Sequence, residues 1–116
     1  MHELGVVFYV IKDVKKIAED NGIEKVNAVT LEIGEVSGVI HEQLIDCWKW
    51  AAGREIMLKD AKLLIEPIHA VTFCEDCKCN YDTVAHGKIC PECGSEHTYL
   101  ITGNEFNIKE IEVFDN

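Results

Sequence analysis

The sequence C74-E-D-C77, followed by twelve residues and then C90-P-E-C93-G94, is the stretch that decides how this chain folds. Two CxxC pairs at this separation are typical of a site in which four thiolates hold one metal ion, and tetrahedral zinc is the predicted occupant. Each pair is expected to fold into a tight turn, here called a knuckle, that points both sulfurs at the ion. A site closed by four thiolates has no open position for water or substrate, so its predicted role is structural.

Two alternatives concern the same stretch. Cys79 offers another register for the first pair, but a single residue between Cys77 and Cys79 does not form the usual knuckle, so Cys79 is predicted to be spare. Iron is the competing metal, because rubredoxin-like sites use similar knuckles. Those sites usually place glycine after the second cysteine of both pairs. Here Gly94 follows Cys93 whereas Lys78 follows Cys77, which favours zinc.

The composition limits the classes of protein that need to be considered. A chain of 116 residues is long enough for one small domain that carries a metal module. No apolar run approaches the roughly 20 residues that span a bilayer, and the N-terminus lacks the basic and apolar regions of an export signal. The chain is therefore predicted to be cytoplasmic, where six cysteines favour metal binding over disulfides.

The charge argues against nucleic-acid binding, which many zinc ribbons perform. Eleven basic residues against 21 acidic ones give a net charge of −10, and residues 74–97 carry two lysines against five acidic residues. Phosphate backbones attract the opposite sign of charge. This balance predicts a protein partner with a basic face, or metal cations, in place of DNA or RNA.

Hydrophobic periodicity predicts the remaining elements. Helical spacing extends from residue 3 to about residue 20 and from His41 to Ala52, with glycine ending each segment. In the first segment the apolar face expected to be buried comprises Leu4, Val7, Phe8, Ile11, Val14 and Ala18. Alternation over residues 25–33 predicts a strand whose odd-numbered side chains face the core. Further strands are expected within residues 61–73, where Pro67 interrupts the pattern, and over residues 98–101 and 105–113, the last two as a hairpin.

This order of elements predicts an α+β fold. The economical arrangement is a sheet of about three strands with two helices on one face, and a zinc-ribbon-like module inserted between the last two strands of the sheet. In terms of domains, residues 1–68 form an α/β domain that the C-terminal strand, residues 104–116, completes. Residues 69–103 form the zinc-binding module.

The N-terminal residues Met1-His2-Glu3 allow two interpretations. In the simpler one, these positions are solvated and Glu3 complements the positive end of the first helix. In the other, the α-amine, the next backbone amide nitrogen and the His2 imidazole chelate one ion in fused rings. Nitrogen-rich planar coordination of this kind suits nickel(II) or copper(II) better than zinc.

Several motifs together resemble one family. The sequence M1-H2-E3-L4 at the start of a helix, the stretch L31-E32-I33-G34-E35-V36-S37-G38-V39 and the two CxxC pairs resemble the hydrogenase nickel-incorporation protein HypA over essentially the full length. The resemblance implies a metallochaperone that delivers nickel to the large subunit of [NiFe]-hydrogenase and works with a nickel-handling GTPase, HypB. Some relatives also supply nickel for urease.

The resemblance also implies site residues. Met1, His2 and Glu3 would hold nickel, with His97 as a possible extra ligand, because some members use a histidine of the zinc module. The residues implied as zinc ligands are Cys74, Cys77, Cys90 and Cys93. His41 departs from the family pattern, which often has proline at the start of the second helix. A monomer and a homodimer are both compatible with the sequence.

Three other functions compete with a nickel carrier. A zinc-ribbon adaptor in transcription or translation is the main alternative, and the net charge argues against it. A rubredoxin-like electron carrier would need iron in place of zinc. An enzyme is not expected, because the sequence shows neither a nucleophile–base pair nor an open metal site.

Overall fold

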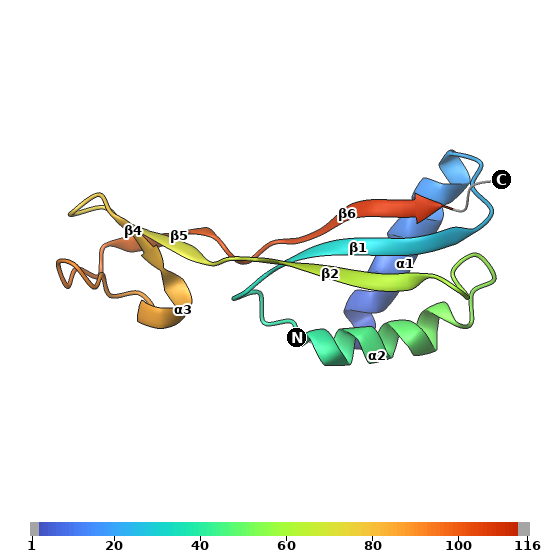
Figure 1. Cartoon of the computed structure of the whole chain (residues 1–116), viewed down its shortest axis with the longest axis horizontal. Coiled ribbons are helices and arrows are strands. Elements are labelled where there is room, and N and C mark those ends of the chain that lie inside the picture. The colour runs from blue at the N-terminus through green and yellow to red at the C-terminus, as the bar shows by residue number, and fades with distance from the viewer. Residues whose placement is uncertain (1–2, 114–116) are drawn as a thin grey trace. The chain divides into compact units, whose positions relative to one another are not determined.

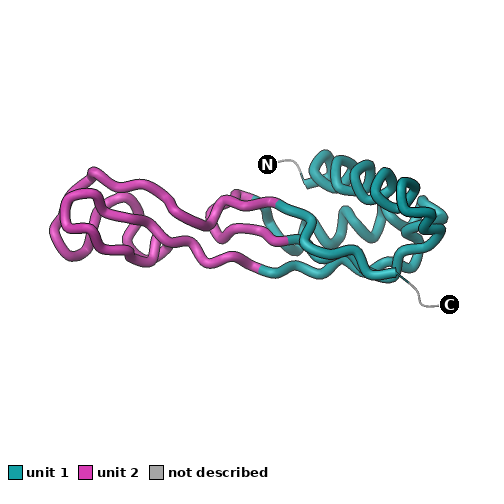
Figure 2. The backbone as a smooth tube through the Cα atoms, turned by 90° about the horizontal axis from the view of Figure 1, so that it is seen from above, with its two compact units in different colours: residues 1–31, 39–66, 107–116 teal, residues 32–38, 67–106 magenta. Residues whose placement is uncertain are grey.

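The computed structural model describes residues 3–113 (Figure 1). The chain divides into two compact units (Figure 2): unit 1 comprises residues 1–31, 39–66 and 107–116, and unit 2 comprises residues 32–38 and 67–106. Residues 32–38, 67–68 and 104–106, which were predicted to belong to the α/β domain, group with unit 2. The elements in chain order are α1 (Glu3–Asp20), β1 (Val26–Gly34), α2 (His41–Ala52), β2 (Lys62–Ile68), β3 (Val71–Cys74), β4 (Asn80–Asp82), α3 (Thr83–His86), β5 (Thr98–Thr102) and β6 (Phe106–Val113).

The core of unit 1 lies between its two helices and a three-stranded sheet. Helices α1 and α2 pack against each other, and Trp48 of α2 is 2% exposed, with its indole nitrogen donating a hydrogen bond to the Ala61 carbonyl at 3.0 Å. The sheet has the strand order β2-β1-β6. On β1 the odd-numbered Val29, Leu31 and Ile33 are buried, as predicted, but the even-numbered Val26 and Ala28 are buried as well. Burial of these side chains holds the helices and the sheet together.

Unit 2 contains a second three-stranded sheet, of order β4-β3-β5. Strand β3 pairs antiparallel with both neighbours, and its register with β5 shifts between Val71 and Thr72. The last residue of β3 is Cys74, so the sheet leads directly into the first knuckle. The predicted α+β fold, with small sheets, few helices and a module in which four cysteines cluster, is confirmed.

Two predictions about local structure were wrong. Strands β5 and β6 do not form a hairpin: β5 pairs with β3, and β6 belongs to the other sheet. The first of the three residues between them, Gly103, has φ of 125°, and a Cβ there would lie 2.5 Å from the Ala70 Cβ. The chain therefore turns away from a hairpin at a point where only glycine fits.

The second error concerns Phe8, which the helical pattern places on the buried stripe of α1. Its side chain is 50% exposed and meets the 54%-exposed Trp50 edge to face, with ring centroids 6.4 Å apart. The Arg54 guanidinium lies 4.8 Å from the centre of the Trp50 ring.

Among residues 3–113, no helix has the length and apolar character that a membrane-spanning helix needs.

Candidate metal centre

The first knuckle follows β3 and is closed by two backbone hydrogen bonds. The Cys74 amide donates to the Cys79 carbonyl at 2.9 Å, and the Lys78 amide donates to the Cys74 carbonyl at 2.9 Å. Lys78 has φ of 61°, and it is the one non-glycine residue with positive φ in the part of the chain that the structure describes. This left-handed residue reverses the chain directly after Cys77, so that the sulfurs of Cys74 and Cys77 point to the same side.

The second knuckle repeats this arrangement sixteen positions later. The Cys90 amide donates to the Ser95 carbonyl at 3.0 Å, and the Gly94 amide donates to the Cys90 carbonyl at 2.8 Å. Gly94 has φ of 73°, a conformation that glycine adopts without strain. The second cysteine of this knuckle, Cys93, is exposed, whereas Cys90 is buried.

The two knuckles bring four sulfurs together. One ligand atom from each of these cysteines lies within 4.8 Å of the other three, with Cys74 Sγ 3.6 Å from Cys93 Sγ and Cys77 Sγ 3.5 Å from Cys90 Sγ. These separations are far too long for disulfides, whose sulfurs are about 2.05 Å apart. They are close to the roughly 3.8 Å between sulfurs placed tetrahedrally at the usual zinc–sulfur distance. The donor set and its geometry therefore fit a zinc ion.

The free thiols of the cluster do not lose their protons together. The backbone amide of Cys77 lowers the pKa of the Cys74 thiol to about 7, against the effect of burial. The Cys79 amide lowers the pKa of Cys77, but burial and the neighbouring thiols raise it more, so the net pKa of Cys77 is raised. The Ser95 amide likewise lowers the pKa of Cys93, while the hydrogen bond with Cys74 and burial give a net increase. A bound cation is what allows all four sulfurs to be thiolates at neutral pH.

Cys79 is exposed, and its sulfur donates to the Cys77 carbonyl at 3.7 Å. It is not a member of the four-cysteine cluster found among residues 3–113. Its backbone carbonyl closes the first knuckle, the position that Ser95 occupies in the second. Cys79 thus contributes to the centre through its main chain.

A small polar network joins the outer sides of the two knuckles. Asp76 accepts hydrogen bonds from the Ser95 hydroxyl and from His97 Nδ1, the second at 3.1 Å. These bonds, with the Ser95 bond as the larger cause, hold the pKa of Asp76 below its usual value. The His97 amide in turn donates to the Ser95 hydroxyl at 3.0 Å. The His97 side chain is 76% exposed, so its second ring nitrogen is accessible beside the cysteine cluster.

The residues predicted to hold nickel can be placed only in part. Met1 and His2 lie outside the described residues. Glu3 is the first described residue of α1 and is 6% exposed, which is unusual for a carboxylate at a chain end. His41 is half-buried at the first residue of α2.

Unit 2 contains a second group of metal-binding residue types that no sequence pattern predicted. Glu35, His69 and Asp82 come from separate segments, and one potential ligand atom from each lies within 4.8 Å of the others. His69 received no role from the sequence, and Glu35 entered only as part of a family motif. Spacing along the chain could not have found this group, because it depends on the pairing of distant segments.

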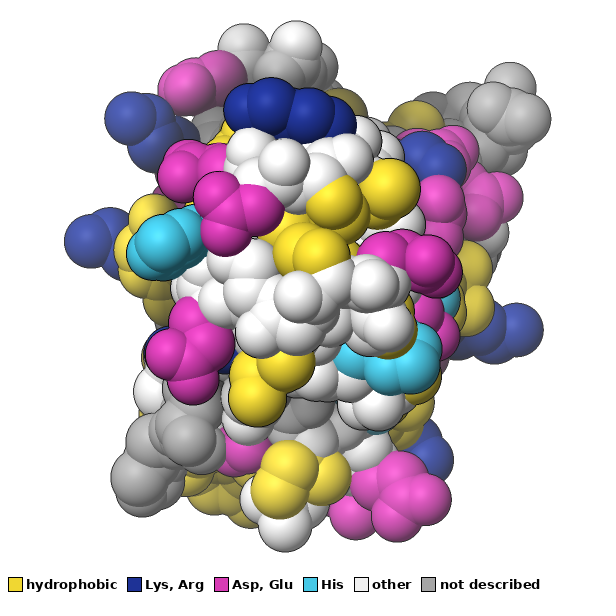
Figure 3. All heavy atoms as spheres, turned by 90° about the vertical axis from the view of Figure 1, so that its left-hand side faces the viewer, with side chains coloured by type: hydrophobic (Ala, Val, Ile, Leu, Met, Phe, Trp, Pro, Cys, Tyr) yellow, Lys and Arg dark blue, Asp and Glu magenta, His cyan; other side chains and the backbone are white. Residues whose placement is uncertain are grey.

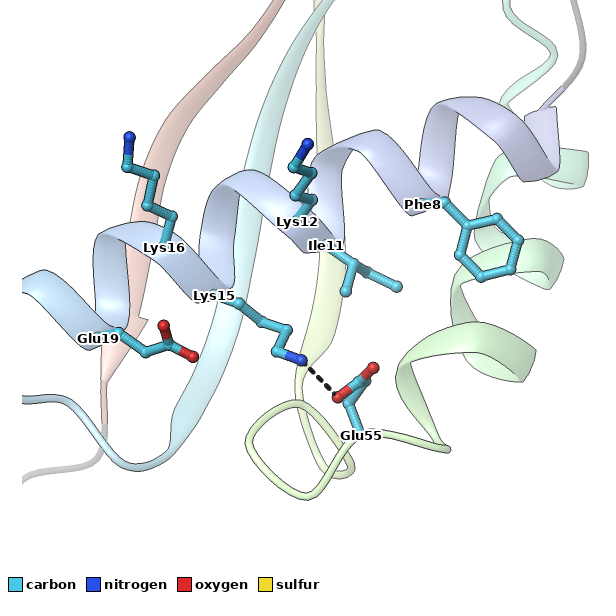
Figure 4. A pocket seen from close by; sticks show the side chains of 7 residues that line it. All are labelled: Phe8, Ile11, Lys12, Lys15, Lys16, Glu19 and Glu55. Atoms are coloured by element: carbon cyan, nitrogen blue, oxygen red, sulfur yellow. Dashed lines mark hydrogen bonds and ion pairs between the residues drawn. The ribbon is translucent and has the colours of Figure 1, made fainter.

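Unit 1 carries a groove of a different character (Figure 4). It is a cavity of about 430 Å³ lined along α1 by Phe8, Ile11, Lys12, Lys15, Lys16 and Glu19, and across from them by Glu55. The Lys15 ammonium points toward the Glu55 carboxylate, at 3.1 Å. A groove that combines apolar side chains, three lysines and two carboxylates suits contact with a protein better than metal binding.

The surface of unit 2 is mixed in character. On the face that Figure 3 presents, small hydrophobic groups lie among acidic side chains, a basic side chain lies at the top, and histidines lie toward the left and right. Such a face suits contacts with proteins better than contacts with phosphate backbones. This agrees with the charge balance of residues 74–97.

Comparison with known proteins gives one consistent result. Residues 1–113 match the family model described as "Hydrogenase/urease nickel incorporation, metallochaperone, hypA". The chain is 37% identical over 114 residues to the hydrogenase maturation factor HypA of Geotalea uraniireducens (97% of this chain, 99% of that protein). It is 31% identical over 112 residues to the maturation factor HybF of Klebsiella pneumoniae, covering 97% of this chain and 98% of that protein.

Solved structures give the same match for the fold. The solution structure of the Ni metallochaperone HypA from Helicobacter pylori superimposes with a TM-score of 0.72 at 25% identity, and all of both chains is covered. A second solution structure of a HypA protein gives a TM-score of 0.74 at 26% identity, covering 98% of this chain and 97% of the other. Both units of the chain are included in these matches.

Proposed function

Because the chain belongs to the HypA family of nickel-incorporation metallochaperones, which are maturation factors and not enzymes, we propose that it binds Ni(II) at its N-terminus and delivers it to the large subunit of [NiFe]-hydrogenase. The observation that carries this proposal is the match of residues 1–113 to the family, together with the four-cysteine cluster. Urease maturation is the other destination that the family description names.

The nickel site consists of the Met1 amine, a backbone amide nitrogen and the His2 imidazole, with Glu3 beside them. Deprotonated nitrogen donors in fused chelate rings suit the planar coordination of nickel(II). A site at a chain end loads quickly and gives up its ion by ligand exchange, as a carrier requires. Affinity alone does not select nickel at such a site, because copper(II) binds nitrogen donors more tightly. Selection therefore comes from partner docking and from the scarcity of free copper.

Cys74, Cys77, Cys90 and Cys93 hold a structural zinc ion. The sulfur separations support this assignment. Zinc supplies the positive charge that allows the four thiolates to coexist, and it joins β3 to the loop before β5. His97, exposed beside this centre, is proposed as an additional nickel ligand.

The proposed partners are the nickel-handling GTPase HypB and the hydrogenase large subunit. Six free cysteines suit the reducing cytoplasm as the place of action. The acidic surface argues for proteins and against nucleic acid. The chain acts as a monomer or a homodimer, and both fit the proposed transfer.

Nickel titration of zinc-loaded protein with a native, untagged N-terminus tests the proposal. We expect the tightest-binding equivalent of nickel on the parent chain to be lost in His2→Ala and in protein whose Met1 amine is acetylated. Each change removes one nitrogen donor of the chelate. His86→Ala is the matched control, because His86 is an exposed histidine far from the chain end in sequence.

Zinc content, measured in the same samples, should be equal in all four proteins. Unchanged nickel binding by both N-terminally altered proteins would refute the N-terminal site. Transfer is tested separately: nickel-loaded parent chain should activate a nickel-free hydrogenase large subunit in the presence of HypB, and His2→Ala should not.

A further inference from the structure

In unit 2, three side chains converge from segments that are far apart in the sequence. Glu35 follows β1, His69 lies between β2 and β3, and Asp82 ends β4. His69 Nδ1 is 2.8 Å from Glu35 Oε1, and His69 Nε2 is 3.6 Å from Asp82 Oδ1. The imidazole is therefore placed between two carboxylates, with one carboxylate at each ring nitrogen.

The two ring nitrogens of His69 make different contacts. The shorter distance is that of a hydrogen bond in which Nδ1–H donates to Glu35, and in that tautomer Nε2 carries a lone pair directed at Asp82. The longer distance does not fit a hydrogen bond. The distance between His69 Nε2 and Asp82 Oδ1 is slightly greater than the separation of nitrogen and oxygen ligands of one ion, which is about 3.0–3.4 Å at usual metal–ligand distances. A small rotation of Asp82 would let both atoms bind the same ion.

The backbone holds this arrangement in place. The Ala70 amide donates to Glu35 Oε1 at 2.6 Å, the Thr102 hydroxyl donates to the His69 carbonyl at 2.9 Å, and the Thr83 amide donates to the Ala70 carbonyl at 3.1 Å. Residues 69 and 70 are thus fixed from three directions. Ligands that are held in advance by such outer contacts bind an ion without an added ordering cost.

The segment that carries Glu35 is fixed as firmly. The Glu35 amide donates to the Ile68 carbonyl at 2.9 Å, and the Val36 amide donates to the Gly103 carbonyl at 2.8 Å. Gly34 lies so close to the next segment that a Cβ there would be 1.9 Å from the Gly103 oxygen. The motif over residues 31–39 therefore holds Glu35 in a position where its carboxylate contacts the ring of His69.

Asp82 gives an independent indication. It occupies the N-cap of α3, where an aspartate usually accepts a hydrogen bond from the following amides, but its side chain makes no capping bond. The carboxylate instead faces His69 Nε2. Its side chain is 46% exposed and that of His69 is 62% exposed, so an ion could enter and leave.

We propose that His69 Nε2 and the Asp82 carboxylate bind one divalent first-row transition-metal ion, with Glu35 holding the imidazole through Nδ1–H and water completing the coordination. Imidazole and carboxylate ligands suit nickel(II), zinc(II) and cobalt(II). A carboxylate that orients a metal-binding histidine through its other nitrogen is a recurrent outer-shell arrangement. The site is separate from the four-cysteine centre and does not rest on the proposed N-terminal nickel site.

The test uses full-length, zinc-loaded His2→Ala protein, so that the N-terminal site cannot contribute. Equilibrium dialysis with Ni(II) should show one exchangeable ion per chain. Adding His69→Ala or Asp82→Asn should weaken this binding more than tenfold, and Glu35→Gln should weaken it by about 10- to 100-fold, as the loss of an outer-shell partner does. Adding His86→Ala instead should leave it unchanged.

A second measurement covers the case in which a variant fails to fold. Substoichiometric Ni(II) or Co(II) added to the His2→Ala protein should broaden the NMR signals of the His69 ring before those of His41, His86 and His97. The proposal is overturned if no ion beyond zinc binds to the His2→Ala protein, if folded His69→Ala binds Ni(II) as tightly, or if another histidine broadens first. Because His2 is absent throughout, these outcomes do not bear on nickel binding at the N-terminus.

Discussion

The first knuckle (residues 74–79) and the second (residues 90–95) close with the same pair of backbone hydrogen bonds, but they differ in the residue that turns the chain. Gly94 does so in the second, and Lys78 does so in the first, with φ of 73° and 61° respectively. Left-handed backbone costs a side-chain-bearing residue about 1–2 kcal/mol, and glycine avoids that cost. The first knuckle therefore contains local strain that the second does not.

The comparison indicates that the CxxC spacing requires the same backbone geometry in both knuckles. Two sulfurs separated by two residues can point at one ion only if the chain reverses after the second sulfur, whichever residue stands there. The side chains that follow are not constrained in the same way. Cys79 and Ser95 accept the same backbone hydrogen bond through their carbonyls but have different side chains. Cys79 therefore differs from Ser95 in its side chain and lies outside the four-cysteine cluster.

The largest expected difference is between Cys93→Ser and Cys79→Ser, which each replace one exposed thiol by a hydroxyl. We expect Cys93→Ser to lose zinc and the cooperative unfolding of unit 2. Structural zinc sites contribute about 10–16 kcal/mol of apparent binding free energy, which is also folding free energy. Cys79→Ser should retain both properties.

Zinc content after chelator treatment and thermal unfolding would measure the two variants side by side. Loss of zinc from Cys79→Ser would mean that the first pair uses the alternative register with Cys79. Retention by Cys93→Ser would remove Cys93 from the ligand set.

A smaller effect concerns the protonation of the cysteine thiols in the two knuckles. In the zinc-free cluster the pKa of Cys74 is about 7, while the pKa values of Cys77 and Cys93 are raised, so the latter two thiols are protonated at neutral pH. Zinc must displace these protons, and its affinity should therefore fall as pH falls, by about tenfold per pH unit for each displaced proton. Calorimetry in buffers of different ionisation enthalpy should detect the release of about two or more protons near pH 7. Release of fewer than one would contradict the uneven protonation.

The helices and the ligand cluster could be predicted because each depends on short-range patterns. The second helix begins and ends at the predicted residues, His41 and Ala52, because one apolar face and a terminal glycine define it. The cysteine pairs also depend on a short-range pattern, because a spacing of two residues is sufficient to form a knuckle. The family resemblance is confirmed by the match over residues 1–113.

The wrong predictions concern features that tertiary contacts determine. The stretch around Gly103 has the residues of a hairpin turn, but its close approach to Ala70 sends the two flanking strands to different sheets. Phe8 has the right period for the core, and its pairing with Trp50 at the surface depends on how α2 lies against α1. The Glu35 and His69 pair has no pattern along the chain at all. The predicted nickel ligand His2 lies outside the described residues and stays a prediction.

The finest test of the comparison exchanges the residues that turn the two knuckles. Gly94→Ala should lower the free energy of unfolding of the zinc-loaded protein by about 1–2 kcal/mol, because a Cβ there meets no atom within 4 Å and only the left-handed conformation is penalised. Lys78→Gly should raise it by at most about 1 kcal/mol, because relief of the strain is partly offset by the greater freedom of glycine in the unfolded chain. Lys78→Ala, which keeps the strain and removes the charge, is the matched control and should lie close to the parent. Urea unfolding monitored by Trp48 fluorescence would follow unit 1 alone, so amide signals of unit 2 are the required probe. If Gly94→Ala and Lys78→Gly destabilise unit 2 equally, the two turns do not differ in strain, and Lys78 must then stabilise the first knuckle through its side chain.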